Sequence, residues 1–160
     1  MTGINLTQLK QNVVQPVLAA FPAQYNSRAA EVLLLGTGLH ESNAGEALRQ
    51  IGGGPALGWL QMETATHDDC WANFLKYQPD LAAAVRRFQV PSAGAGQMVW
   101  NLAYAAAMAR VKYIRAPAVL PAADDYAGLA TYYKAVFNSS LGAAVVDADL
   151  IGCFRQAGAA

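Results

Sequence analysis

The stretch QMVWNLAYAAAMARVKYIR, residues 97–115, carries the strongest structural signal in the chain. Its apolar and small side chains recur every three or four positions, which places them along one face of a helix. Alanine, the best helix former, fills much of the stretch, and neither proline nor glycine interrupts it. We therefore expect one uninterrupted helix here, at the centre of the core.

Helical patterns flank this stretch on both sides. Residues 6–21 form a helical pattern that Pro16 should kink or divide, and Asn26 or Ser27 can cap a stronger helix running towards Glu41. Thr66 followed by Asp69 resembles a capping box. Further helices are expected from Pro79, over residues 124–137 and after Asp147. A short hairpin near the glycine-rich loop at 52–55 is the only strand signal, so the predicted class is mainly α, in a single domain over residues 1–160.

The composition narrows the function classes. Of the 160 residues, 54% are hydrophobic and 14% are charged, and the 11 basic residues equal the 11 acidic ones. A chain without a basic excess gives no reason to expect nucleic acid as a partner. No apolar run is long enough to span a membrane, and the N-terminus lacks a secretion-signal pattern. Cys70 and Cys153 could pair, but their apolar helical surroundings favour free thiols.

Glu41 is the candidate catalytic residue. It lies three and four positions after Gly38 and Thr37, on a stripe that also carries Leu34, so its carboxylate should be partly desolvated. Burial raises the pKa of a carboxyl group, which suits a general acid. Gly36 in the same helix, like Gly38, indicates that another element packs closely against it. The alternative is a solvent-facing glutamate in the last turn of the helix.

The residues after Glu41 resemble the soluble lytic transglycosylase family. That family pairs a Glu-Ser at a helix end with a later Gly-Leu-Met-Gln-Ile-x-Pro-x-Thr run. Here Glu41 and Ser42 are followed by ALGWLQMETAT, residues 56–66, in which Gly58, Gln61 and Thr66 occupy the corresponding places. Trp59 and Leu60 replace the Leu-Met pair, and Glu63 with Thr64 replaces the proline-containing stretch.

A third family element, Ala-Tyr-Asn-Ala-Gly, has a loose counterpart in AVFNS, residues 135–139. Asn138 is retained, whereas Phe137 stands where the family has a tyrosine near the catalytic glutamate. The resemblance covers about residues 27–142 and is greatest to small bacteriophage transglycosylase-like proteins. It implies a lysozyme-like fold with a short loop or hairpin after the catalytic helix.

The resemblance implies a chemistry that needs one glutamate. Such an enzyme cleaves the glycosidic bond of peptidoglycan between MurNAc and GlcNAc without water, with Glu41 as acid and then base. Ser42 would orient Glu41, and Gln61 would bind a sugar N-acetyl group. The resemblance also implies that Gly58 and Asn138 bind the substrate. Glu63 either lines the cleft or lies on a surface loop.

Two aromatic residues, Trp59 and Tyr133, could stack on sugar faces, although aromatic residues in such patterns more often belong to the core. His40 and His67 lack the spacing of a zinc site, so neither a metal nor another cofactor is expected.

Three functions follow as hypotheses. The first is a virion-associated lytic transglycosylase of a phage, made in the host cytoplasm, acting on peptidoglycan strands and accompanied by other virion proteins. The second is a structural virion protein that keeps a lysozyme-like fold without activity, which the Phe137 substitution and the low charge motivate. The third is a hydrolytic muramidase in which Glu63 or another carboxylate activates water.

Overall fold

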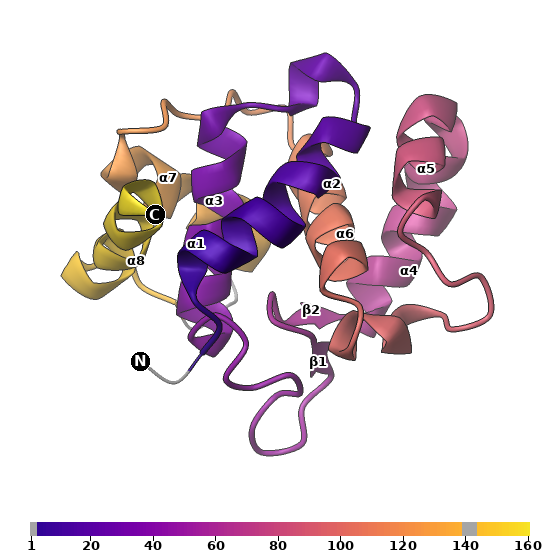
Figure 1. Ribbon diagram of the computed structural model, residues 1–160, viewed down its shortest axis with the longest axis horizontal. Helices are drawn as coiled ribbons and strands as arrows, with labels where there is room; N and C mark the ends of the chain where they lie inside the picture. The colour runs from indigo at the N-terminus through magenta and orange to yellow at the C-terminus, as the bar shows by residue number, and fades with distance from the viewer. Residues whose placement is uncertain (1–2, 139–143) are drawn as a thin grey trace.

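The computed structural model describes residues 3–138 and 144–160, so Ser139, the last residue of the third motif, lies outside the described residues. The predicted mainly helical class is confirmed. Figure 1 shows the following elements: α1 (Leu6–Leu9), α2 (Gln15–Ala20), α3 (Arg28–Ser42), β1 (Ala56–Leu57), β2 (Met62–Glu63), α4 (Thr64–Asn73), α5 (Pro79–Arg86), α6 (Leu102–Ile114), α7 (Tyr126–Tyr133) and α8 (Ala148–Ala159).

Helices α3 and α6 contact each other in the middle of the molecule, where most of their residues are buried. Helices α7 and α8 pack together on one side of this pair, and α4 and α5 contact α6 on the other (Figure 1). The antiparallel hairpin of β1 and β2 pairs Ala56 with Glu63 and Leu57 with Met62, and lies in the lower half of the molecule in this view. The hairpin expected near the glycine-rich loop is therefore present.

The N-terminal helix is continuous through Pro16 because its hydrogen-bond pattern changes there. A π-helical turn, Lys10–Val14, joins α1 to α2, and Pro16 lies in the first turn of α2. Proline has no N–H to donate and its ring clashes with the preceding turn, so a wider turn before it removes both conflicts. The expected break at Pro16 thus takes the form of a π turn.

Helix α3 begins as the sequence predicts. Ser27 is its N-cap, with Oγ accepting from the Ala30 amide at 3.2 Å. The two glycines of α3 face different neighbours. A Cβ at Gly36 would lie 2.3 Å from the Phe154 ring of α8, and one at Gly38 would lie 2.2 Å from the indole of Trp59. The predicted close packing against α3 is present at both glycines.

Two predicted boundaries are wrong. The stretch 97–115 is not one helix, because Asn101 caps a new helix, α6, through a side-chain bond to the Tyr104 amide, and a 3-10 turn, Ala95–Val99, precedes it. Helix α4 begins at Thr64, so Thr66 and Asp69 lie inside it and form no capping box. Helix propensity could not locate the break at Asn101. At the break, Asn101 Nδ2 donates to the Phe88 carbonyl, and this bond depends on the tertiary structure.

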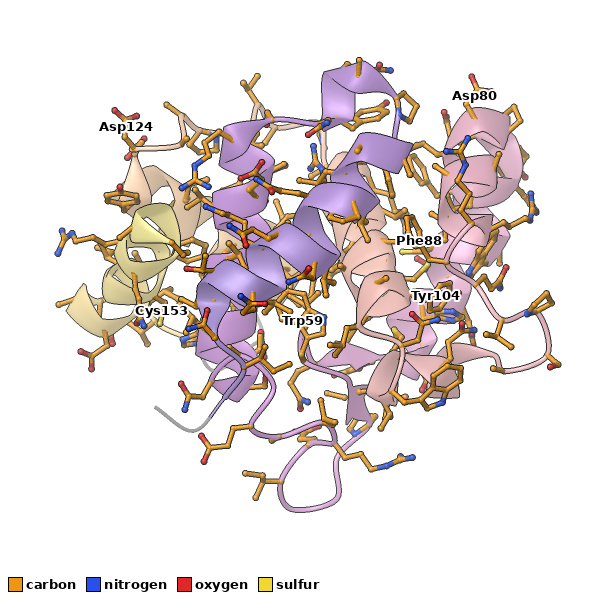
Figure 2. The ribbon with its side chains drawn as sticks, in the orientation of Figure 1. Trp59, Asp80, Phe88, Tyr104, Asp124 and Cys153 are labelled. Carbon is orange, nitrogen blue, oxygen red and sulfur yellow. The ribbon has the colours of Figure 1, made fainter. Side chains whose placement is uncertain are left out.

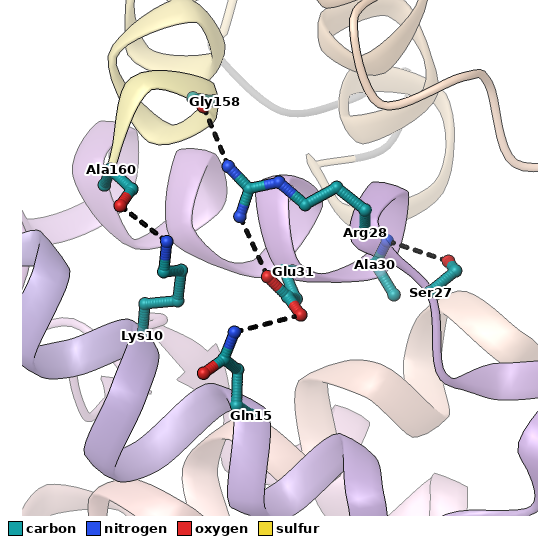
Figure 3. A network of polar contacts seen from close by, with 8 residues as sticks. All are labelled: Lys10, Gln15, Ser27, Arg28, Ala30, Glu31, Gly158 and Ala160. Carbon is teal, nitrogen blue, oxygen red and sulfur yellow. Dashed lines mark hydrogen bonds and ion pairs between the residues drawn. The ribbon is translucent and has the colours of Figure 1, made fainter.

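Two cationic side chains from the N-terminal part of the chain bond the C-terminal end of α8. Arg28 donates to the carbonyl of Gly158 and to the carboxylate of Glu31, and Lys10 donates to the backbone oxygen of Ala160 (Figure 3). These groups satisfy carbonyls at the end of α8 that have no helical partner.

Both cysteines are free thiols, as the sequence favoured. Within the described ranges, no helix is long and apolar enough to cross a membrane.

Candidate functional site

Glu41 lines a cleft of about 710 Å³. It is the penultimate residue of α3, and Asn43 ends the helix in the left-handed conformation with φ of 49°. The cleft walls come from the end of α3, the loop and hairpin after it, helix α6, and the π-helical turn Lys134–Asn138 that follows α7. Gln61, Glu63 and Asn138 line the same cleft, so the three motifs meet here.

The carboxyl group of Glu41 has the protonation properties of a general acid. Burial raises its pKa from the ordinary 4.5, while a hydrogen bond from Tyr133 and the charge of Lys112 lower it by smaller amounts. The Tyr133 hydroxyl donates to Oε1 of Glu41 at 2.5 Å. The net rise keeps a proton on the carboxyl group at higher pH than an exposed glutamate would allow.

Tyr133 is a positioning residue of the core. Its side chain is 0% exposed, so its ring cannot stack on a sugar, and that expectation is wrong. Rings of His40, Phe137 and Phe154 surround it, with centroid distances of 5.3, 6.1 and 6.1 Å. Burial, followed by the charge of Glu41, raises the Tyr133 pKa far above its usual range, so the hydroxyl stays protonated and remains a donor.

Tyr133 supplies the hydroxyl that Phe137 lacks. The two residues are four positions apart, and their rings stack at an interplanar angle of 23°. Residues at this spacing share one helix face, so the sequence did contain a signal that a tyrosine one turn earlier could reach Glu41. The Phe137 substitution therefore leaves Glu41 with a phenolic donor.

Lys112 is a cleft residue that sequence reasoning missed. Its ammonium donates to the carbonyl of Phe137 and lies 4.2 Å above the centre of that ring. Burial lowers the Lys112 pKa, and the nearby groups that raise it include Glu41 and Glu63. The cation thus lies close to both carboxyl groups of the cleft. The helical pattern of residues 97–115 gave no sign that Lys112 would line the cleft.

Ser42 does not orient Glu41 as expected. Its Oγ donates to the carbonyl of Trp59 at 2.6 Å and accepts from the Gly45 amide at 2.8 Å. Ser42 therefore joins the end of α3 to the hairpin loop. Gly58 has a similar structural role, because its φ is +75° and a Cβ there would lie 2.2 Å from the Met98 carbonyl.

Trp59 is part of the core, and the expectation that it stacks on a sugar is wrong. The side chain is 0% exposed and its Nε1 donates to the Leu102 carbonyl at 3.1 Å. Figure 2 shows it in the interior, between elements that surround it, whereas Asp80 lies at the periphery. The indole covers Gly38 one turn before Glu41, so it packs against the helix that carries Glu41.

The remaining candidates line the cleft with polar atoms. Gln61 has a φ of 48°, and its Nε2 donates to the Gly58 carbonyl at 2.8 Å and more weakly to that of Ala47 at 3.4 Å. These bonds fix the amide plane and leave Oε1 to accept from a ligand. Asn138 Oδ1 accepts from Lys134 at 2.8 Å, and Glu63 is exposed on β2.

The described part of the chain contains no group of three His, Cys, Asp or Glu side chains that could hold a metal ion. No protein-family model matches the chain, and neither does any curated protein or solved structure with which it was compared. The residues of the cleft provide one half-buried acid with a fixed donor, a cation beside it and polar atoms along the wall.

Proposed function

We propose that the protein is a peptidoglycan lytic transglycosylase in which Glu41 is both the acid and the base. The observation that carries this proposal is the environment of Glu41. Its carboxyl group opens on the cleft, has a raised pKa, and accepts a 2.5 Å bond from Tyr133. The motif order Glu41-Ser42, Gly58 to Thr66 and Asn138 supports peptidoglycan as the substrate.

In the first step, protonated Glu41 gives its proton to the glycosidic oxygen. The bond between C1 of MurNAc and that oxygen breaks, the GlcNAc end leaves as an alcohol, and positive charge develops at C1. Because Tyr133 donates to Oε1, Oε2 is left to carry the proton that is transferred. The Tyr133 hydroxyl and the Lys112 ammonium stabilise the carboxylate left behind.

In the second step, that carboxylate takes the proton of the C6 hydroxyl of MurNAc. The hydroxyl oxygen bonds to C1 and closes a 1,6-anhydro ring, which restores protonated Glu41. Water takes no part, so no second carboxylate is required. Gln61 Oε1 can accept from the N–H of an N-acetyl group, and the cleft volume of about 710 Å³ suits a bound saccharide.

Mass spectrometry of the soluble muropeptides from Gram-negative sacculi tests the proposal. The parent protein should release anhydro-muropeptides, and Glu41→Gln should release almost none while keeping its fold. Glu46→Gln, which removes an exposed carboxylate that lines neither described cavity, is the matched control and should act like the parent. Equal product from Glu41→Gln and the parent would exclude Glu41 as the acid.

A hydrolytic muramidase is the second candidate, because Glu63 lies in the same cleft. In that reaction Glu63 would activate water or stabilise the charge at C1, and the products would carry reducing ends. Reducing-end products that disappear in Glu63→Gln would establish hydrolysis. If neither the parent nor any variant released product of either type, the remaining hypothesis would be a structural role in the virion.

A further inference from the structure

A second cavity, of about 650 Å³, lies next to the cleft and shares Lys112 with it. Thr66, Lys112 and Val136 line both cavities, so the two cavities adjoin each other, and Glu41 lines the first of them. The second cavity is flanked by the end of α6 and by the loop that follows it. A substrate whose reacting bond lies at Glu41 could therefore extend a substituent into this second cavity.

The second cavity is lined by charged side chains and by small apolar ones. Lys112 in the last turn of α6 and Arg115, the C-cap residue of that helix, contribute two positive charges, and Asp69 contributes one negative charge. In a chain whose charges sum to zero, this net positive cavity is a local feature. The wall of small side chains is made by Ala65, Ala116, Pro117, Ala118 and Ala135.

Arg115 is held in place through NH1, and the other edge of its guanidinium is open to a ligand. Its NH1 donates to Oδ2 of Asp69 at 2.6 Å and to the sulfur of Cys70 at 3.4 Å, and the guanidinium lies 5.8 Å from the centre of the Phe74 ring. The side chain is 30% exposed. Among the residues that the structure describes, Nε and NH2 bond no other group, so this edge can bind a carboxylate with two parallel bonds.

We propose that this second cavity binds the acidic stem peptide of peptidoglycan, with Arg115 pairing one of its carboxylates. The inference rests on the proposed function, since the stem is attached to the sugar that reacts at Glu41. The volume suits a short peptide better than a single carboxylate group, and the wall of small side chains accommodates alanine methyl groups. Arg115 is a specificity residue here, because it touches the substituent and none of the reacting atoms.

Kinetics on two glycans test this assignment. One is glycan with intact stems, and the other is glycan stripped of stems by an amidase. Arg115→Gln should raise KM for the intact glycan about tenfold and much less for the stripped one, with kcat for the intact glycan nearly the same. Arg115→Lys keeps the positive charge but loses the paired N–H donors of the guanidinium. Its KM for the intact glycan should lie between those of the parent and Arg115→Gln. Lys76→Gln removes an exposed cation elsewhere and is the matched control.

Titration calorimetry with the isolated stem peptide provides a readout that needs no turnover. The parent should bind the peptide about tenfold more tightly than Arg115→Gln does, and amidation of the peptide carboxylates should abolish that difference. Equal KM changes on both glycans, or equal peptide affinity in parent and variant, would overturn the stem assignment. If the parent releases no anhydro product, the proposed function fails, and the calorimetry still decides the peptide site.

Discussion

The hydroxyl of Tyr133 lies 2.5 Å from Oε1 of Glu41, although the two residues are 92 positions apart in the chain. The bond crosses from α7 to the last turn of α3, and Tyr133 is held by the rings around it. A donor fixed in this way favours the charged form of the carboxylate, in opposition to burial. It therefore affects both the orientation of Glu41 and the pH at which Glu41 titrates.

Tyr133→Phe should reduce turnover at least tenfold, because a hydrogen bond to a charged group contributes about 1.5–3 kcal/mol. The Tyr133 bond lowers the pKa of Glu41, so its removal should raise that pKa further. Glu41 must be protonated at the start, so the alkaline limb of the pH profile of kcat should move to higher pH. Tyr132→Phe removes a hydroxyl that bonds the Tyr113 carbonyl instead, and is the control. An unchanged alkaline limb in Tyr133→Phe would contradict this relationship.

Glu41→Gln should stabilise the protein at neutral pH. The pKa of Glu41 is raised in the folded state, so between about pH 4.5 and that raised value the folded chain binds more protons than the unfolded chain. Stability due to this group is fully present below that window and is lost as the pH rises through it. The melting temperatures of parent and variant should therefore be similar near pH 4, and the variant should melt higher at pH 7. Glu63→Gln, which removes an exposed carboxylate from the same cleft, is the control. A lower melting temperature for Glu41→Gln at pH 7 would show that the buried carboxylate stabilises the fold.

Gly38→Ala should destabilise the protein by about 2–3 kcal/mol. The new Cβ would lie 2.2 Å from the buried indole of Trp59, which has no room to move. Gly152→Ala, within α8, meets nothing within 4 Å and should stabilise by about 0.5–1 kcal/mol through helix propensity. Urea unfolding of both variants measures the difference. If both changes stabilised the fold, close packing at Gly38 would be refuted.

Ile51→Ser should raise KM about fivefold without loss of stability. Ile51 is 88% exposed, lines the cleft, and would lose much of that exposure under a bound saccharide. Val119→Ser removes an apolar side chain that is 91% exposed and lines neither described cavity. Val119→Ser should therefore leave KM unchanged. Similar KM values for the two variants would mean that the substrate does not reach Ile51.

Local sequence signals predicted those features that neighbouring residues decide. Ser27 at an N-cap, Pro79 in a first turn and the paired glycines of α3 each depend on backbone groups or spacing within a few residues. The break before α6 was missed because Asn101 bonds the Phe88 carbonyl, 13 residues away. The start of α4 was misplaced because Glu63 caps it without a side-chain bond, so its sequence carries no capping signal.

The sequence by itself determined the mainly helical class, the position of Glu41 on a half-buried helix face and the order of the three motifs. These follow from periodicity, capping and residue order, which are properties of contiguous chain. Only the tertiary structure decided that Tyr133 supplies the donor to Glu41, that Lys112 lies beside it, and that Trp59 and Ser42 support the site from within. Those roles depend on distances between segments far apart in the chain, and such distances are set by how the helices pack.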